Sequence, residues 1–393
     1  MLRGRPITTD EDQRVTFIEL FFDLVFVYAV TQVVTLLHDE LTWPTVGRAV
    51  LVFWLVWWAW TQFTWALNSA DTTHPAVDVS MLLATAVAFL MAVVVPDAFG
   101  DAGAWFAATY ITVRALGLAV YSRVAWDDSA MRNAVRVFRL ASLTGMAAVA
   151  AGGAASGNAR LWWWGAAILL DLFAAAIGGT AEGLDIRPEH FAERHGLFVI
   201  IALGESLIVA AAGLTGAERT AQTVAVGILA VTVTCGLWWT YFSRAKPALD
   251  HALARYQDTE RSALARDAFS VLHFLVVFGI VLVAIAVEEA VEHPDASLPV
   301  NASAALAGGL VLFLGATGAA LWRAGKGLLV ARFGILAAMA LAVWVAHSGS
   351  VIWSLLVAVA GTAAIAVVEH VRFVAPEARP AAPAPTPMPS DAR

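Results

Sequence analysis

Apolar runs of about twenty residues recur along the chain, and they constrain its fold more than any other feature. A helix rises about 1.5 Å per residue, so each run can cross the roughly 30 Å hydrocarbon core of a bilayer. Helices are required there because lipid offers the backbone no hydrogen-bond partners. We predict spans over residues 16–37, 46–67, 77–96, 104–124, 136–153, 161–180, 195–214, 222–243, 267–288, 302–322, 329–346 and 350–368. The expected fold is an all-α, polytopic transmembrane helical bundle of about 12 spans.

Composition excludes several classes of protein. Hydrophobic residues make up 60% and charged residues 14% of the 393 residues, which excludes a chain of soluble domains. The net charge of −7 argues against nucleic-acid binding. The single cysteine, Cys235, lies in an apolar run, so we expect no disulfide framework and no thiolate metal cluster.

Motifs for enzyme chemistry are missing from the sequence. The "AGKG" around Lys326 lacks the upstream glycine and the following Ser/Thr of a P-loop. The nine histidines show no metal-ligand spacing, and no G-x-S-x-G occurs. We therefore assign no catalytic residue, no cofactor and no metal, and the sequence leans against an enzyme without excluding one.

The basic residues predict the topology. With the N-terminus inside, 20 of the 24 Lys and Arg residues fall in cytoplasmic segments. Arg48, Arg160 and Arg219 fall in outside loops, and Arg114 remains within a span. This positive-inside bias places both termini in the cytoplasm.

Three regions follow. Residues 1–15 form a cytoplasmic N-terminal segment, and residues 16–370 form the transmembrane helical domain. Within the domain, the polar and amphipathic loop 244–266 is expected to form a helix on the cytoplasmic surface. The Pro/Ala-rich tail, 371–393, is expected to be a disordered cytoplasmic segment.

A 6+6 internal repeat is indicated by two aromatic stretches. "LVWWAWTQFTWA" in the second span is echoed by "GLWWTYFSRA" in the eighth, six spans later. Six-helix halves of the same orientation are typical of one class of secondary transporter. The alternative is that tryptophan gathers near membrane interfaces in general, and the echo reflects only that preference.

Ionisable side chains inside spans give the sharpest functional signal. A central acid or arginine costs on the order of 2.5–3.5 kcal/mol on insertion, so such groups face the bundle interior or a wet cavity. The candidates for a substrate or ion path are Glu19, Asp23, Arg114, Asp171 and Glu205, together with Ser206 and His273.

Glu19 and Asp23 share one face of the first span, because four residues turn a helix by about 400°. We expect them to form the wet cytoplasmic mouth of a path that leads to Glu205 near the midplane. There, Gly204 would admit a neighbouring backbone and Ser206 adds a hydroxyl. The alternative is that these acids are only hydrogen-bond partners between helices.

Two further candidates have structural alternatives. Arg114 needs an acidic partner, and Asp171 and Glu205 lie at comparable depth. Such a pair can be functional or purely structural. His273 is either a path residue or a satisfied core histidine.

The second span combines tryptophans with polar residues in "FWLVWWAWTQFTWALNSAD". Trp54, Trp58, Gln62 and Trp65 are expected to form an aromatic, hydrogen-bonding wall of a substrate path. The alternative is an aromatic belt that only fills space.

Three stretches, "FIELFFDLVFVYAVTQ", "ERHGLFVIIALGES" and "LWWTYF", resemble the low temperature requirement A (LtrA) family of bacterial membrane proteins. The similarity runs from about Arg14 to about Arg372. It implies a multi-pass helical protein of the bacterial cytoplasmic membrane, and it matches the family's acids to Glu19, Asp23 and Glu205. It implies no reaction.

The leading functional hypothesis is a secondary transporter or ion-coupled permease for an unknown small solute or ion, with H⁺ or a cation among the candidates. The first alternative is a membrane-embedded, lipid-modifying enzyme that uses the same acids with His273. The second is a non-catalytic membrane scaffold or receptor-like protein. The expected partners are membrane lipids and the solute. The sequence leaves the substrate and the oligomeric state open.

Overall fold

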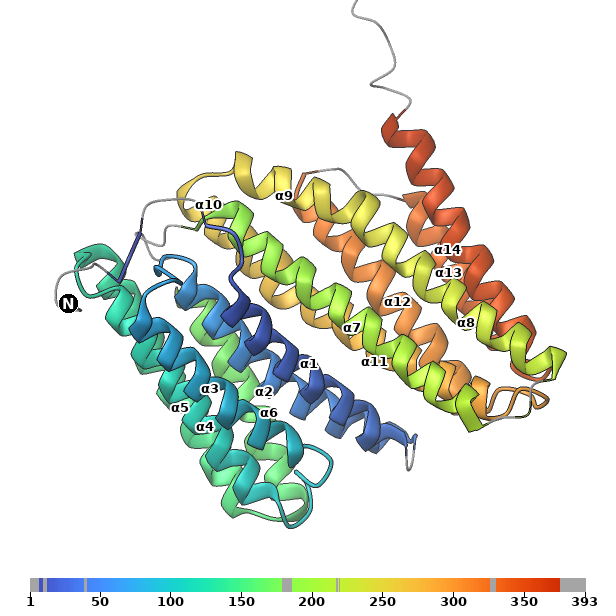
Figure 1. Cartoon of the computed structure of the whole chain (residues 1–393), viewed down its shortest axis with the longest axis horizontal. Helices are drawn as coiled ribbons and strands as arrows, with labels where there is room; N and C mark the ends of the chain where they lie inside the picture. Colours follow the sequence, from blue (N-terminus) through green and yellow to red (C-terminus); the bar gives the residue numbers. More distant parts are fainter. Residues whose placement is uncertain are drawn as a thin grey trace, which may run out of the picture.

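The structure is a computed structural model of the chain. It describes residues 7–9, 13–38, 41–178, 186–216, 218, 220–325 and 330–374. Helices joined by short turns account for nearly all of these residues (Figure 1).

The first six helices are α1 (Phe17–His38), α2 (Trp43–Leu67), α3 (Pro75–Val93), α4 (Gly103–Val124), α5 (Ser129–Ala154) and α6 (Gly157–Gly178). Capping residues in the sequence explain where some of them start. Thr42 caps α2 through the Thr45 amide at 3.4 Å, and Asp128 caps α5 through the Ala130 amide at 2.8 Å. Helix α5 therefore begins seven residues before the predicted span at 136.

The remaining helices are α7 (Pro188–Gly216), α8 (Ala221–Thr240), α9 (Lys246–Arg255), α10 (Asp258–Leu264), α11 (His273–Glu292), α12 (Val300–Arg323), α13 (Val330–Ala346) and α14 (Val351–Val374). Two π-helical segments interrupt the series. They are η1 (Tyr241–Ala245), between α8 and α9, and η2 (Ala265–Leu272), between α10 and α11.

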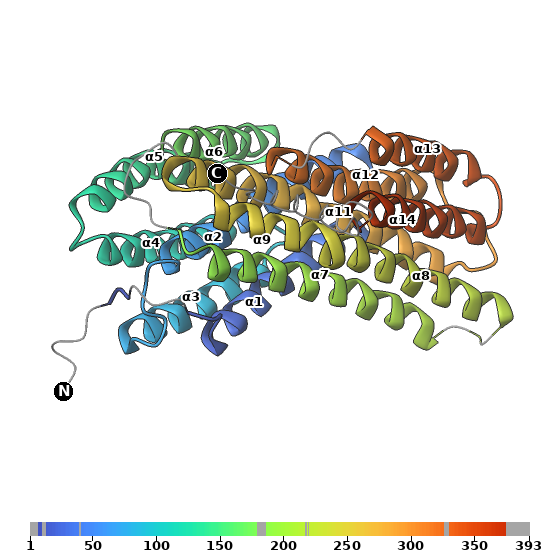
Figure 2. The same cartoon turned by 90° about the horizontal axis from the view of Figure 1, so that it is seen from above.

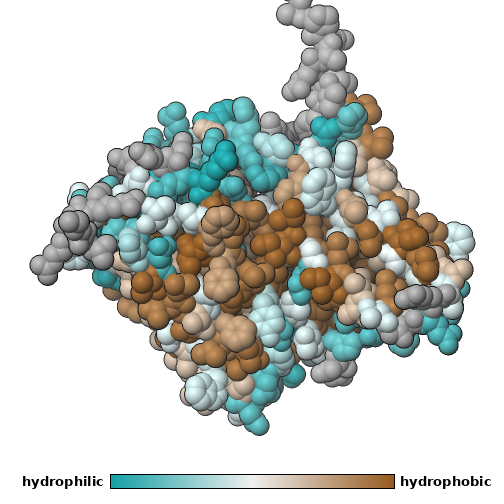
Figure 3. Space-filling model, viewed as in Figure 1, coloured by the Kyte–Doolittle hydropathy of each residue, from teal (hydrophilic) through white to brown (hydrophobic). Residues whose placement is uncertain are grey.

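The predicted polytopic bundle is confirmed. Among the described residues, 11 helical stretches are long and apolar enough to cross a membrane. The shorter apolar helix α13 has 17 residues and coincides with the eleventh predicted span. A brown hydrophobic band crosses the face shown in Figure 3, and hydrophilic residues gather at the end over α9 and α10. The band is the surface that a bilayer would cover.

The helices form two groups of six spans, α1–α6 and α7–α14, that lie side by side (Figures 1 and 2). The same pairs pack in both groups. In the first, α1 packs on α3, α2 on α4 and α6, and α5 on α4 and α6. In the second, α7 packs on α11, α8 on α12 and α14, and α13 on α12 and α14. This repeated packing supports the predicted 6+6 repeat.

One glycine pair shows how closely these helices approach. A Cβ built on Gly279 of α11 would lie 2.7 Å from the carbonyl oxygen of Gly309 on α12. Only residues without a side chain allow two membrane helices to meet at this distance. The close approach of α11 and α12 therefore depends on these two glycines.

The expected surface loop 244–266 takes a different form. Rather than one separate helix, it continues α8 through η1 into α9, and α10 continues through η2 into α11. Tyr256 and Gln257 connect the two long helices, between the end of α9 and the start of α10. Asp258, the first residue of α10, has a positive φ of 47°. The amphipathic sequence extends both spans because its apolar residues, among them Leu249, Leu253 and Leu264, pack into a small core of their own.

The tail boundary also moves. Helix α14 continues to Val374, so the first four residues assigned to the disordered tail are helical. The rest of the predicted tail, and most of the predicted segment 1–15, lie outside the described residues. The start of α1 and the end of α14 lie at the same end of the bundle as α9 and α10 (Figure 1). We call this the α9–α10 end.

Candidate functional site

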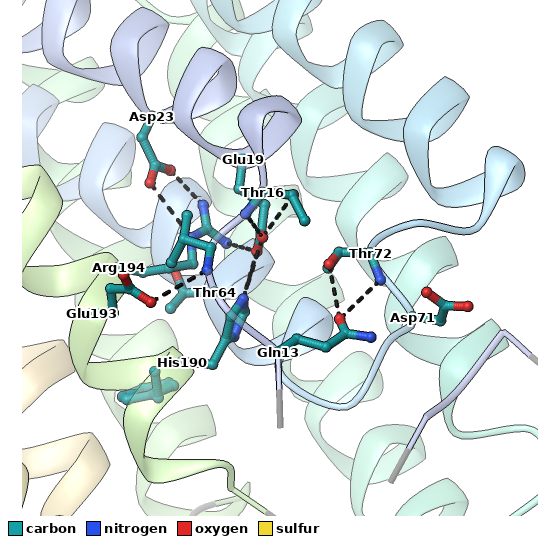
Figure 4. A network of polar contacts seen from close by, with 12 residues as sticks. Gln13, Thr16, Glu19, Asp23, Thr64, Asp71, Thr72, His190, Glu193 and Arg194 are labelled. Atoms are coloured by element: carbon teal, nitrogen blue, oxygen red, sulfur yellow. Dashed lines mark hydrogen bonds and ion pairs between the residues drawn. The ribbon is translucent and has the colours of Figure 1, made fainter. Parts of the chain in front are cut away.

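Glu19 and Asp23 lie at the α9–α10 end of α1, and both side chains are fully buried (Figure 4). They share one helical face, as their spacing predicts, and that face meets α7 of the other group. The expectation of a wet mouth is wrong for this structure. The acids are closed off from solvent because partners on α2 and α7 cover them.

Arg194 of α7 is the central partner. Its guanidinium binds Asp23 through two nitrogens, with one short contact from Nη2 and a second from Nε at 3.4 Å. Its Nη1 lies 3.6 Å from Oε1 of Glu19. The Trp60 indole donates to Asp23 Oδ1 at 2.7 Å, and its ring lies under the guanidinium. Arginine suits this position because it can serve two carboxylates at once.

His190, one turn before Arg194, completes the cluster. Its Nε2 lies 3.0 Å from Oε1 of Glu19, and Thr16 donates to the other Glu19 oxygen through its amide at 3.0 Å and its hydroxyl at 2.9 Å. The Val15 amide donates to Glu193 at 3.3 Å, which ties the segment before α1 to α7 beside the cluster (Figure 4). We call Glu19, Asp23, His190 and Arg194 the interface cluster.

Charge counting shows what the interface cluster can do. Its two carboxylates and one guanidinium leave one negative charge uncompensated while His190 is neutral. A buried net charge is unfavourable, so a proton on the cluster would stabilise its burial. Nε2 of His190 donates to Glu19, which leaves Nδ1 as the open nitrogen, and Nδ1 is buried without a hydrogen-bond partner. Protonation of one member of the cluster would balance its charge.

A layer of aromatic side chains lies next to the cluster, around His195 and His273. His273 Nδ1 donates to the Ala268 carbonyl at 2.7 Å, so its Nε2 accepts the Tyr241 hydroxyl at 2.7 Å. His273 is thus a satisfied core histidine, the alternative that the sequence left open. His195 Nδ1 donates to the Phe191 carbonyl at 2.8 Å, and its Nε2 is buried without a hydrogen-bond partner.

The π-helical segment η2 explains how this layer is held. Widened helical turns displace backbone carbonyls from their usual partners, and such segments are frequent at functional sites. Trp57 donates to the Ser270 carbonyl at 2.7 Å, and Trp65 donates to the Ser270 hydroxyl at 2.9 Å. The second span therefore supports η2 through two indole donors.

Arg114 finds its partner within the first group of helices. Its Nη2 lies 3.4 Å from Asp171 of α6, and its Nη1 donates to the Tyr110 hydroxyl at 3.0 Å. Both charged side chains are buried. Of the two acids that the sequence offered, Asp171 is therefore the partner and Glu205 is not.

Glu205 lies apart from the other acids. It is about 16 Å along α7 from Arg194, at about 1.5 Å per residue, and its side chain is half-buried. Ser206 donates to the Leu203 carbonyl of its own helix at 2.7 Å. A Cβ on Gly204 would meet nothing within 4 Å, so the expectation of a close backbone approach there is wrong. The structure does not bring Glu205 together with Glu19 and Asp23.

The aromatic wall is present on α2. Trp54 and Trp58 stack with their ring centroids 5.4 Å apart. Trp58, Gln62 and Trp65 line a cavity between α2 and helices α4, α5 and α6. These three predicted wall residues therefore do surround a space, which is separate from the interface cluster.

The sequence did not identify four ionisable residues that are buried in ion pairs. They are His190, Arg194, Arg332 and Glu369. Arg194 and His190 fell outside the predicted seventh span, which began at 195, yet α7 begins at Pro188. Proline in the first helical turn, as in "RPEH", is the signal that would have found this start. Arg332 and Glu369 form a buried ion pair between α13 and α14, with a contact to Thr317. Both residues lie at span ends, where charge is expected at the surface.

One group of side chains has the geometry for a metal ligand set. His38, Glu288 and Glu292 place ligand atoms within 4.8 Å of one another at the end of the bundle opposite α9 and α10. His38 and Glu292 are exposed, and acidic groups of this kind are common without an ion. These three residues are therefore not sufficient evidence for a metal site.

Comparison with known proteins places the chain in a family. Residues 14–368 match the family described as bacterial low temperature requirement A protein (LtrA). An uncharacterized protein of Rhizobium meliloti (strain 1021) is 28% identical over 324 residues, which cover 80% of this chain and 78% of that protein. No solved structure matches the chain. Since the match spans the whole bundle, including α1, α7 and the interface cluster, the chain belongs to the LtrA family of multi-pass membrane proteins.

Proposed function

We propose that this LtrA protein is a proton-coupled secondary transporter of the bacterial cytoplasmic membrane, with the α9–α10 end and both termini in the cytoplasm. The twelve apolar helices, the repeated packing of two six-span groups and the basic residues that flank the spans support this proposal. The missing P-loop favours coupling to an ion gradient over coupling to ATP.

The observation that carries the proposal is the buried ion pair between Asp23 and Arg194. It joins α1 of one group to α7 of the other, at the interface where alternating access requires movement. Buried charges within a membrane are costly, and they mark ion pathways and proton relays more often than they add stability. A purely structural clamp would not need a cluster with one negative charge to spare.

The mechanism follows from this charge. With a proton on the interface cluster, its charges balance and the two groups stay closed at the α9–α10 end. Release of the proton to the cytoplasm leaves one negative charge buried, which favours water entry and separation of α1 from α7. Proton release and opening are therefore linked, and a solute bound between the groups would leave with the proton.

The test uses His190→Gln, which keeps a donor for Glu19 but cannot carry a proton. Protein in liposomes is presented with amino acids, sugars, organic acids, nucleosides and monovalent cations while transport currents are recorded under an imposed pH gradient. We expect at least one class to give a wild-type current that depends on the pH gradient and is absent in His190→Gln. His251→Gln, a change at an exposed histidine of α9, should leave the current unchanged.

Two results would contradict transport. One is that no class of solute gives a wild-type current. The other is a pH-dependent current that is equal in wild type and His190→Gln. In either case, measuring turnover of the reconstituted phospholipids separates a lipid-modifying enzyme from a scaffold.

A further inference from the structure

A second site lies on a different face of α2 from the interface cluster. Trp58, Thr61, Gln62 and Trp65 of α2, Tyr121 of α4 and Phe138 of α5 surround a cavity of about 50 Å³. One water requires roughly 10–15 Å³, so the cavity has room for a small ligand. Four aromatic side chains, those of Trp58, Trp65, Tyr121 and Phe138, supply flat apolar walls.

Two polar atoms on one wall of this cavity have no partner. The Gln62 amide nitrogen donates to the Arg114 carbonyl at 3.0 Å, which fixes the side chain so that Oε1 is its free acceptor. Oε1 is buried and makes no hydrogen bond, and the same holds for the hydroxyl of Thr61. Both side chains are 3% exposed. An unpaired buried polar group is unfavourable, so a ligand that pairs with these two atoms would be stabilised.

The neighbouring residues are arranged to keep Gln62 in this position. A Cβ on Gly117 of α4 would lie 2.6 Å from the Gln62 amide nitrogen, so only glycine leaves room for the amide. Thr64, two residues from Gln62 and on another face of α2, bonds back to the Trp60 carbonyl at 3.3 Å as membrane threonines usually do. Thr61 makes no such bond, and its buried hydroxyl has no hydrogen-bond partner in the part of the chain that the structure describes.

Positive charge gathers where η2 borders the cavity. Arg266 lines it, and its Nη2 lies 2.7 Å from Asp267. Arg323 binds the second oxygen of the same carboxylate at 2.8 Å. Two guanidinium groups thus share one carboxylate, which leaves one positive charge for an anion.

From these features we infer that the cavity binds a small aromatic carboxylate whose ring carries a hydrogen-bond donor. The ring lies between the aromatic walls, the donor pairs with Gln62 Oε1 and Thr61, and the carboxylate lies at Arg266. The claim that this ligand is transported rests on the proposed function. The claim that it binds in the cavity does not.

The position of the cavity connects it to the interface cluster. At about 100° per residue, Trp57 and Trp60 face the cluster, while Trp58, Thr61 and Trp65 face the cavity roughly a third of a turn away. Ser270 lies at the junction, because Trp57 binds its carbonyl and Trp65 binds its hydroxyl. A ligand that moves Trp65 would therefore act on the same η2 segment that packs beside His195 and the cluster.

Calorimetric titration of the purified full-length protein in detergent tests the inference with four probes. They are 4-hydroxybenzoate, benzoate without the donor, 4-hydroxybenzamide without the charge, and cyclohexanecarboxylate without the flat ring. We expect 4-hydroxybenzoate to bind tightest, and each omission to weaken binding by about three- to tenfold or more.

Matched variants assign the contacts. Thr61→Val should leave the unliganded melting temperature unchanged or raised, because the lost hydroxyl had no partner, and should weaken 4-hydroxybenzoate about three- to tenfold without affecting benzoate. Thr64→Val should leave 4-hydroxybenzoate binding unchanged. Arg266→Gln should weaken the carboxylates by at least about tenfold, and Arg244→Gln, at the same end of the bundle, should not.

The inference is overturned if 4-hydroxybenzoate gives no binding heat at millimolar concentration. It is also overturned if all four probes bind equally or if Thr61→Val binds like the wild type. Binding without a solute current would retain the cavity assignment and reject transport. A solute current without 4-hydroxybenzoate binding would retain transport and reject the cavity assignment.

Discussion

Arg114 and Asp171 show, at the scale of single residues, why membrane charges come in pairs. Their side chains are buried between α4 and α6, and Tyr110 supplies a further contact to the guanidinium. Burial of a lone charge is costly, whereas a pair with good contacts is close to neutral when both partners are removed together. Comparing removal of one partner with removal of both partners therefore tests this pair directly.

Arg114→Leu alone should destabilise the protein by about 3–5 kcal/mol, because Asp171 is left buried without its counter-charge. Adding Asp171→Asn should restore most of the folded yield, measured by fluorescence size-exclusion chromatography. Glu205→Gln should not restore it, since Glu205 lies on α7 without contact to Arg114. Rescue by Glu205→Gln rather than by Asp171→Asn would refute the pairing.

Glu205 provides a contrast with the acids of the interface cluster. Glu205→Leu should change the stability by less than about 1 kcal/mol, because this half-buried side chain has no ion-pair partner among the described residues. Asp23→Leu should cost about 1–3 kcal/mol, because Arg194 and the Trp60 indole would both lose a buried hydrogen-bond partner. Thermal unfolding of both variants gives the comparison, and equal losses would mean that Glu205 has an essential contact.

At the scale of helices, the π-helical segment η2 depends on the tryptophans of α2. Its Ser270 carbonyl has the Trp57 indole as a partner, whereas the Trp54 indole nitrogen has none. The two tryptophans lie one turn apart, both are buried, and both pack against Phe53 or Phe274. They therefore form a matched pair that separates hydrogen bonding from packing.

Trp57→Phe should lower the melting temperature more than Trp54→Phe does. Both changes remove similar apolar area, but only the first removes a buried hydrogen bond, which contributes about 0.5–1.5 kcal/mol. Equal shifts in differential scanning fluorimetry would show that the Ser270 carbonyl does not need this bond.

Most helices could be predicted from the sequence because a bilayer demands long apolar runs, and runs such as those of α2 and α11 are hard to miss. The starts of α5 and α7 could not, since both begin in polar sequence that extends beyond the apolar run. The same cause hid Arg194 and His190. Asp23 and Glu19 were found because they lie inside an apolar run, but their partners lie at a helix start where charge is ordinary.

At the scale of the whole molecule, two groups of six spans place the start of α1 and the end of α14 at the same end of the bundle. The sequence indicates this arrangement through its basic residues and its aromatic echo. It could not show which helices pack across the groups, because contacts such as α1 with α7 depend on tertiary packing rather than on a local pattern.

Cysteine labelling tests the orientation. In a Cys235→Ser background, a cysteine at the exposed position 257, between α9 and α10, should react only with permeant reagents in intact cells. A cysteine at the exposed position 295, between α11 and α12, should also react with impermeant reagents. Labelling of both positions from the same side would contradict the topology.

The central claim is that one proton on the interface cluster controls contact between the two groups of helices. The groups that titrate or carry charge there are Glu19, Asp23, His190 and Arg194, with Glu193 bound to the Val15 amide nearby. Spin labels at the exposed positions 127 and 257 report the distance between the groups at the α9–α10 end.

Electron paramagnetic resonance in nanodiscs should give one short distance at acidic pH and a second, longer distance at alkaline pH, because loss of a proton leaves the cluster with one uncompensated negative charge. His190→Gln should show the longer distance at both pH values, because its cluster keeps the uncompensated negative charge. A wild-type distance that does not change with pH, or an equal change in His190→Gln, would contradict the account.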